Sequence, residues 1–304
     1  MTTLKKIDNY LNQPKHAAYM FIAPAFIAIL LFCIIPLIAS LVISTLNVTT
    51  YFNNIRYIGL KNYNVAFRDS AFINSWRITL LFTLFDVPIG MALALLIAAL
   101  VQTSSAGDKL FRSIYILPII CSATVIGLMW NLILNQNIGW LVWFMEKIGL
   151  GKVAIFSNHK TAIYGIIFVS FWRSFGVSSL ILVAAMQGVN RDLYEAAELD
   201  GAGKFKQFVH VTMPGITSTF WFTLITRVIS SFQVFDLIYV ITDGGPANST
   251  RAVVNYIYSE AFSSGKNRLG YATAMSEVLF AVILFITIIL YSVMRKQEKD
   301  VGIS

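Results

Sequence analysis

Long apolar runs alternate with polar stretches along the chain, and the length of the runs predicts membrane-spanning helices. A helix needs about 20 apolar residues to cross the hydrocarbon core of a bilayer. Runs that reach or approach this length lie at residues 18–46, 75–101, 113–134, 161–186, 216–241 and 270–294. The pattern therefore predicts an all-α, polytopic membrane protein with six transmembrane helices over residues 18–294. A short polar N-terminus at 1–17 and a charged tail at 295–304 flank this domain.

The segments between the predicted spans are polar, with one exception. Within the connection at 135–161, the stretch 140–145 is apolar and is expected to lie along the membrane interface. Six spans place both termini on one side, together with the link at 102–112 and the segment at 187–215. Lys and Arg are divided almost equally between the two sides, so charge bias does not fix the orientation.

Composition supports a membrane protein and argues against several other classes. Of the 304 residues, 57% are apolar and only 12% charged, whereas a soluble domain carries about 25% charged residues. The net charge of +8 is dispersed, without a basic run that would indicate nucleic acid binding. Cys33 and Cys121 both lie in apolar runs, and the three histidines have no metal-ligand spacing. We therefore predict no metal site and no catalytic centre.

The segment 187–215 is the most charged interruption between two predicted spans. Asp192 is expected to cap a helix, and Gly201 to help end it, because glycine tolerates a left-handed conformation. A second short helix, at 204–210, is expected to run up to Pro214, which ends it. On these features alone, an ordinary solvated loop with capped helices is the competing interpretation.

The order of residues in this segment resembles the EAA loop of permease subunits in ATP-binding-cassette (ABC) importers, whose pattern is EAA-x3-G-x9-IxLP. Here Glu195-Ala196-Ala197 precedes Gly201 at the family spacing, and Val211-x-Met213-Pro214 closes the pattern. In that family the loop docks into a cleft of the cytoplasmic ATPase subunit. The resemblance implies that the ATPase-docking residues are Tyr194, Glu195, Ala196, Ala197, Asp200, Gly201 and Phe205.

Further stretches resemble the carbohydrate-uptake branch of this family. They are FIAPA at 21–25, GLKNY at 59–63, FQVFDLIYV at 232–240, GGP at 244–246 and LGYATA at 269–274. The resemblance implies a type I ABC importer permease architecture in a bacterial inner membrane, with cytoplasmic termini. It also implies four kinds of partner: a second homologous permease subunit, two ATPase subunits, an extracytoplasmic sugar-binding protein and membrane lipid.

The sequence Gly201-Ala202-Gly203-Lys204 superficially resembles a phosphate-binding loop. A Walker A motif would need glycine at position 198 and Ser or Thr at 205, where this chain has Glu198 and Phe205. The chain is therefore expected to bind no cofactor itself, with ATP and Mg on the partner ATPase subunits.

Charged residues inside the predicted spans are candidates for a substrate path. Each costs about 2.5–3.5 kcal/mol at the bilayer centre, so such residues face a partner side chain or a water-filled cavity. For Arg173 and Asp236 the two interpretations are equally weighted; for Arg227 and Glu277 an interhelical partner is favoured. The spacing of Phe232, Asp236 and Tyr239 predicts one shared helical face. The substrate-binding candidates are Trp172, Arg173, Phe232, Gln233, Asp236 and Tyr239.

These features predict the transmembrane permease subunit of a sugar- or oligosaccharide-importing ABC transporter. Two alternatives remain open. One is an ABC permease for another solute, such as a phosphorylated polyol. The other is an ion-coupled secondary carrier, in which Asp86, Asp236 and Glu277 would relay the ion. The sequence leaves open which sugar is carried, how long it is, and whether this subunit or its partner forms most of the pocket.

Overall fold

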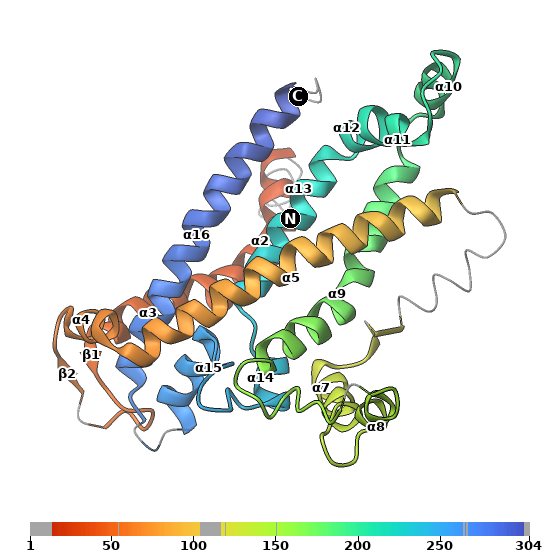
Figure 1. Cartoon of the computed structure of the whole chain (residues 1–304). Helices are drawn as coiled ribbons and strands as arrows, with labels where there is room; N and C mark the ends of the chain where they lie inside the picture. The colour runs from red at the N-terminus through yellow and green to blue at the C-terminus, as the bar shows by residue number, and fades with distance from the viewer. Residues whose placement is uncertain are drawn as a thin grey trace, which may run out of the picture. The chain divides into compact units, whose positions relative to one another are not determined.

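The computed structural model describes residues 14–53, 55–103, 117–118, 120–149, 151–263, 265 and 267–300. Most of the predicted N-terminus at 1–17 and of the link at 102–112 lies outside these residues. Helices dominate the described chain (Figure 1). Up to the middle of the chain, the elements are α2 (Pro14–Ile29), a π-helical segment η1 (Leu30–Ile34), α3 (Ile35–Ser44), β1 (Leu46–Asn47), β2 (Arg56–Tyr57), α4 (Lys61–Arg68), α5 (Ser70–Thr103), α7 (Ala123–Ile133), α8 (Trp140–Lys147) and α9 (Ala162–Gln187).

The second half of the chain is built from shorter helices and one long terminal helix. They are α10 (Arg191–Leu199), α11 (Lys204–Gln207), a π-helical segment η2 (Phe208–Thr212), α12 (Met213–Gly215), α13 (Thr217–Phe232), α14 (Asp236–Ile241), α15 (Val253–Tyr258), a π-helical segment η3 (Ser259–Ser263) and α16 (Leu269–Asp300). The apolar run predicted at 270–294 is thus part of a longer helix, which continues through residues predicted as tail.

The chain divides into two compact units, which are described separately. The first comprises Met1–Ala66 and Glu260–Glu277. Within it, Leu46 and Asn47 pair with Tyr57 and Arg56 in a two-stranded antiparallel ladder. The Ser40 hydroxyl of α3 donates a hydrogen bond to the carboxylate of Glu277 on α16. The interhelical partner predicted for Glu277 is therefore confirmed.

The second unit comprises Phe67–Ser259 and Val278–Ser304. Its centre is the packing of α5 against α9. The small residues Ala94 and Ala98 of α5 are fully buried and belong to the same apolar cluster as Leu182 and Met186 of α9. Small side chains let two membrane helices approach closely, which strengthens van der Waals packing where no hydrophobic effect acts between them. This helix pair is the frame on which the functional site lies.

Four described helices are long and apolar enough to cross a membrane: Ala18–Ser44, Ser70–Val101, Ala162–Gln187 and Leu269–Lys299. A fifth span results if Lys204–Gly215 and Thr217–Phe232, which meet at 75°, are counted together. The predicted third span at 113–134 is represented by the 11-residue helix α7, and residues 113–116 and 119 of that span lie outside the described part of the chain. The structure thus has four or five candidate spans of the six predicted.

The predicted continuous span at 216–241 is wrong. Helix α13 ends at Phe232, three residues follow in a non-helical conformation, and α14 starts at Asp236. The sequence predicted that Phe232, Asp236 and Tyr239 share one helical face. Because the helix is broken between them, they do not. The break contains neither glycine nor proline, so the hydropathy pattern gave no sign that the helix is interrupted there.

Candidate functional site

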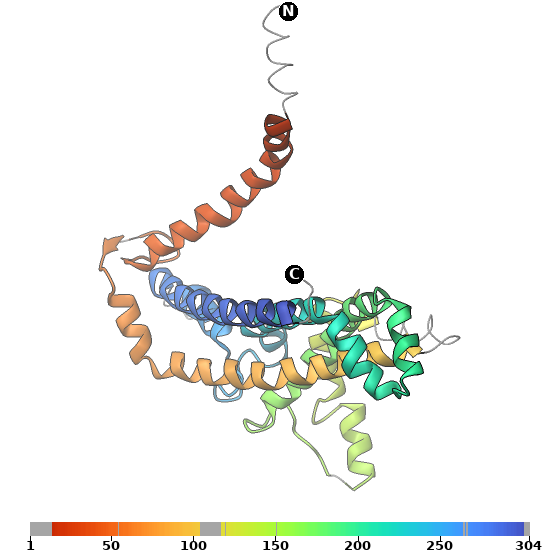
Figure 2. The ribbon, with the colours of Figure 1, turned by 90° about the horizontal axis from the view of Figure 1, so that it is seen from above.

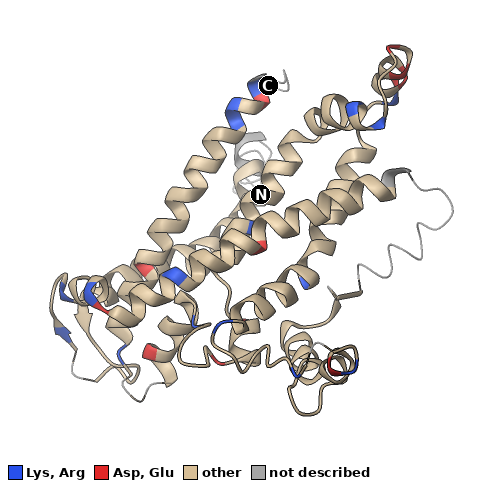
Figure 3. Ribbon diagram, in the orientation of Figure 1, with Lys and Arg blue, Asp and Glu red and all other residues tan. Residues whose placement is uncertain are grey.

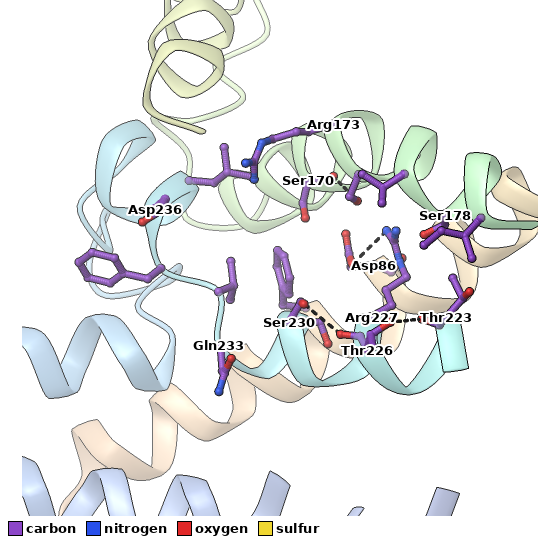
Figure 4. Close-up of a pocket in the computed structure, with 18 residues that line it drawn as sticks. Asp86, Ser170, Arg173, Ser178, Thr223, Thr226, Arg227, Ser230, Gln233 and Asp236 are labelled. Carbon is purple, nitrogen blue, oxygen red and sulfur yellow. Dashed lines mark hydrogen bonds and ion pairs between the residues drawn. The ribbon is translucent and has the colours of Figure 1, made fainter. Parts of the chain in front are cut away.

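A cavity of about 420 Å³ lies among α5, α9, α13 and α14 of the second unit (Figure 4). The break between α13 and α14 forms part of its wall. Among the described residues, it is lined by Phe82, Asp86, Ser170, Arg173, Ser174, Val177, Ser178, Ile181, Thr223, Thr226, Arg227, Ser230, Ser231, Gln233, Val234, Phe235, Asp236 and Leu237. Its volume falls in the range of about 300–1,000 Å³ that is typical of small-molecule sites.

Hydroxyl groups dominate the polar lining of this central cavity. Ser170, Ser174 and Ser178 follow one another at four-residue spacing on α9, so a helix presents them on one face. The other lining hydroxyls belong to Thr223, Thr226, Ser230 and Ser231 on α13.

Most of these hydroxyls donate to the carbonyl of a residue three or four positions earlier. Examples are Ser174 to Ser170 (2.7 Å), Thr226 to Phe222 (2.9 Å) and Ser230 to Thr226 (2.9 Å). A hydroxyl that donates its hydrogen in this way keeps lone pairs that accept. The cavity wall therefore offers a ligand several neutral acceptors.

A buried ion pair forms one side of the cavity. The Arg227 guanidinium of α13 lies 3.1 Å from the Asp86 carboxylate of α5, and both side chains are only 5% exposed. Arg227 also donates to the Asp86 backbone carbonyl through Nε (3.3 Å) and Nη2 (3.1 Å). A Cβ at Gly90 would lie 1.9 Å from Arg227 Nη2, so only glycine leaves room for the guanidinium there. The interhelical partner predicted for Arg227 is confirmed.

The second pair of charges on the cavity wall is less enclosed. Arg173 of α9 is half-buried, and its Nε is buried without a hydrogen-bond partner among the described residues. Asp236, the first residue of α14, is exposed. In Figure 4 both residues lie away from the Asp86–Arg227 pair, toward the other end of the cavity. The described lining thus carries two guanidinium groups and two carboxylates, which balance in charge.

Three of the six substrate-binding candidates line this cavity: Arg173, Gln233 and Asp236. The three aromatic candidates do not. Trp172 packs edge-to-face on Trp130 at 5.3 Å between ring centroids, and Phe232 is buried, with 3% exposure. Tyr239 stacks on Phe235 at 5.3 Å.

The aromatic surface of the cavity comes instead from Phe82 and Phe235. Sequence reasoning also missed the seven hydroxyls, although a signal was present. Ser170, Ser174 and Ser178 repeat at helical spacing inside an apolar run that needs no serine to span a membrane.

The segment that resembles the EAA loop forms a helix-turn-helix at one end of α5 and α9 (Figure 2). Its first helix, α10, is capped by Asn190, whose side chain accepts from the backbone N–H of Asp192 at 3.1 Å. The prediction that Asp192 is the cap was wrong by two residues. Charged residues gather on this segment, while the helical stretches leading to it are largely uncharged (Figure 3).

Gly201 ends α10 in a left-handed conformation, with φ of +73°. The N–H of Ala202 donates to the carbonyl of Ala197 (2.9 Å), and that of Gly201 to Glu198 (3.0 Å). These two bonds form a Schellman motif, which satisfies the last carbonyls of a helix. Nothing lies within 4 Å of a Cβ built at Gly201, so the backbone conformation alone favours glycine there.

The predicted docking residues differ in exposure. Glu195, Ala196 and Asp200 are exposed, and Phe205 is 80% exposed. Leu199, which was not among the predicted docking residues, is 90% exposed. These two large apolar side chains are available for contact with another molecule. Tyr194 is instead half-buried, and its hydroxyl lies 2.9 Å from that of Thr212. That bond joins α10 to the second half of the segment.

The second half of this segment runs further than predicted. Helical structure continues from Lys204 to Gly215, so Pro214 does not end it. Pro214 lies in α12, which directly follows the π-helical segment η2. Phe208 and Met213 pack on the apolar cluster of α5 and α9. The segment is therefore anchored to the two long helices by one face while it exposes the other.

Comparisons with known proteins give a common result. Residues 87–301 match the family described as "Binding-protein-dependent transport system inner membrane component". The probable ABC transporter permease protein YurN of Bacillus subtilis is 32% identical over 286 residues, which cover 91% of this chain and 95% of that one. The trehalose/maltose transport system permease protein MalF of Thermococcus litoralis is 28% identical over 277 residues, covering 91% and 93%.

A solved structure has a similar fold. The chain matches one chain of a bacterial ABC transporter involved in the import of the acidic polysaccharide alginate, with a TM-score of 0.82 and 22% identity. The match covers 97% of this chain and 99% of that chain.

Proposed function

Because the chain belongs to the family of inner membrane components of binding-protein-dependent transport systems, we propose that it is the permease subunit of an ATP-driven sugar importer. A relative that is 28% identical carries the name of a trehalose/maltose permease. The observation that carries the substrate class is the lining of the central cavity.

This lining fits a neutral polyhydroxylated molecule better than an ion. Hydroxyl oxygens whose hydrogens are bound to the helix backbone are acceptors for the O–H groups of a sugar. Arg173 also lines the cavity, and its Nε is buried without a hydrogen-bond partner among the described residues. Phe82, Val234 and Phe235 add apolar side chains to the lining. Two positive and two negative groups balance, whereas a site for a phosphorylated solute would need a surplus of positive charge.

The coupling of this cavity to ATP is part of the same proposal. The exposed side of the segment 190–205 is the docking surface for a cytoplasmic ATPase subunit, which binds ATP and Mg. Helix α9 leads from that segment to the cavity, and α13 leads back to it across the 75° bend. Movement of the segment with the ATPase would therefore shift both walls of the cavity. This chain is the non-catalytic transport subunit of the assembly.

The proposed assembly holds a second homologous permease subunit, two ATPase subunits and an extracytoplasmic sugar-binding protein, in a bacterial inner membrane. Both termini of this chain lie in the cytoplasm. The partner permease and lipid cover the apolar side chains of α2 and α3, many of which are exposed in the chain by itself.

A substrate screen tests this proposal. The chain is purified with its co-assembling subunits and binding protein, and ATP hydrolysis is measured with neutral mono- and oligosaccharides, uronates and sn-glycerol 3-phosphate. We expect a neutral sugar to stimulate hydrolysis several-fold. Stimulation by the phosphorylated compound alone would favour a phosphorylated-polyol importer, and uptake driven by an ion gradient without ATP would favour a secondary carrier.

A further inference from the structure

A second pocket, of about 340 Å³, lies in the same unit beside α7 and α14. Amide side chains dominate its polar lining, and we refer to it as the amide pocket. Among the described residues, it is lined by Asn131, Leu134, Asn135, Gln136, Asn137, Phe156, Ser157, Ile241, Thr242, Gly245 and Pro246.

We refer to residues 190–215, which resemble the EAA loop, as the docking segment. The amide pocket and the docking segment lie at opposite ends of the helices that connect them (Figure 1). Ser157 precedes the start of α9, and the docking segment follows its end. The 26 residues of α9 extend over about 39 Å, which exceeds a hydrocarbon core of about 30 Å. Helices α13 and α14 also connect the two regions. Helix α13 starts after Ile216, at the end of the docking segment, and α14 ends at Ile241, which lines the amide pocket. The pocket therefore opens on the side of the membrane opposite the docking segment.

The pocket offers both hydrogen-bond donors and acceptors without a charge. Asn131 donates through Nδ2 to the carbonyl of Ile241 (2.8 Å), which leaves its Oδ1 as an acceptor. The Oδ1 of Asn135 accepts from the backbone N–H of Asn137 (2.9 Å), which leaves its amide N–H groups as donors. Gln136 and Asn137 extend this set, and both are exposed. No Asp, Glu, Lys or Arg is among the described lining residues.

One wall of the amide pocket is an aromatic ring held in place by packing. Phe156 lies against Gly165 of α9, where a Cβ would come within 2.8 Å of the ring. Phe156 also packs against the apolar cluster that includes Ile163 and Ile166. A fixed aromatic face beside neutral amides is the combination that binds the apolar face and the hydroxyls of a sugar ring.

The two pockets follow one another along the same helices. Leu237 of α14 lines the central cavity, and Ile241, one helical turn later, lines the amide pocket. Ser157, which lines the amide pocket, lies just before the start of α9. Ser170, which lines the central cavity, lies about two turns into the same helix. A ligand that entered from the amide pocket would reach the central cavity by passing α14.

We propose that the amide pocket is a receiving subsite for a neutral sugar ring, occupied before the ring reaches the central cavity. This inference rests on the proposed import of sugars, and it adds a second site with its own residues. The receiving subsite selects for uncharged, polyhydroxylated rings on the side of the membrane where the substrate arrives.

Direct sugar binding tests the subsite without depending on transport. The complex in lipid nanodiscs, without ATP or binding protein, is titrated with maltose, trehalose, glucose and sn-glycerol 3-phosphate by saturation-transfer difference NMR. The double variant Gln136→Ala/Asn137→Ala is compared with Asn64→Ala, which removes an exposed amide from the other unit. We expect the double variant to weaken binding of a neutral sugar by about five- to tenfold, the effect of losing one or two hydrogen bonds. Asn64→Ala should leave that binding unchanged.

A second titration separates sugar binding from protein docking. The unloaded binding protein is titrated onto the same variants by surface plasmon resonance, and its affinity should not change. An equal loss of affinity for the unloaded protein would make the pocket a protein-docking surface and overturn the proposal. Unchanged sugar binding in the double variant, or no sugar binding by the unmodified complex, would overturn it too. The ATP hydrolysis screen judges the sugar-importer function independently of either result.

Discussion

Gly201 and the Asp86–Arg227 pair are two places in the described part of the chain where individual residues influence how helices are arranged. At Gly201, a left-handed backbone turns the chain from α10 into α11. At Gly90, the absence of a side chain admits the guanidinium that joins α13 to α5. The backbone conformation at Gly201 and the packing around the Asp86–Arg227 pair each allow the effect of a substitution to be predicted.

Replacement of Gly201 by valine should detach the ATPase while leaving the membrane helices folded. A left-handed conformation costs a β-branched residue about 1–2 kcal/mol, and the exposed site offers nothing to offset it. Asparagine adopts this conformation more readily, so Gly201→Asn is the matched control. The measurement is the amount of ATPase subunit that co-purifies with each variant. If both variants co-purified with as much ATPase subunit as the wild-type chain does, the turn would not position the docking surface.

The Asp86–Arg227 pair should stabilise the bundle only while both partners are present. Removal of one partner leaves the other charge buried, at a cost of about 3–5 kcal/mol. Asp86→Asn or Arg227→Gln should therefore lower the thermal stability of the purified complex. The double variant, with two neutral amides, should be more stable than either single variant. Additive losses in the double variant would contradict an interaction between the two residues.

At the scale of elements, the apolar runs predicted the long unbroken helices well. Helix α9 is one residue from its predicted start and end, and α5 begins five residues early. The pattern failed where a helix breaks without a glycine or proline, between Phe232 and Asp236. It also ended the second helix of the segment 187–215 at Pro214, because proline was taken as a stop, whereas helical structure continues through Pro214 to Gly215.

We predict that helix α8 lies at the membrane interface, because its exposed side chains are typical of that region. Trp140 and Trp143 are both about 60% exposed, and Lys147 lies over the Trp143 ring at 5.8 Å. Tryptophan is enriched where hydrocarbon meets water. A spin label at Trp143→Cys, with Cys33 and Cys121 replaced by serine, should be relaxed by oxygen dissolved in lipid. A label at Lys152→Cys should respond to a water-soluble nickel complex instead. A water-like response at both positions would place α8 away from the bilayer.

At the scale of the whole molecule, the central cavity could be anticipated only in part. Arg173, Gln233 and Asp236 were predicted from charge in apolar runs and from family resemblance, and all three line the cavity. The partner of Arg227 lies 141 positions away in the sequence, and no local pattern links it to Asp86. Phe232 and Tyr239 were predicted to share a face with Asp236 only because the helix was taken as continuous. Pairings between distant helices depend on packing, which a single sequence does not display.

ATP-driven uptake tests the central claim most directly. The chain, its partner permease and the ATPase subunits are reconstituted in proteoliposomes. The binding protein and a radiolabelled sugar chosen from the hydrolysis screen are added outside, and ATP is enclosed within. We expect the sugar to accumulate only when ATP and all subunits are present, and not with this chain alone. Accumulation by this chain alone, without ATP, would contradict the claim that it is the permease subunit of an ATP-driven importer.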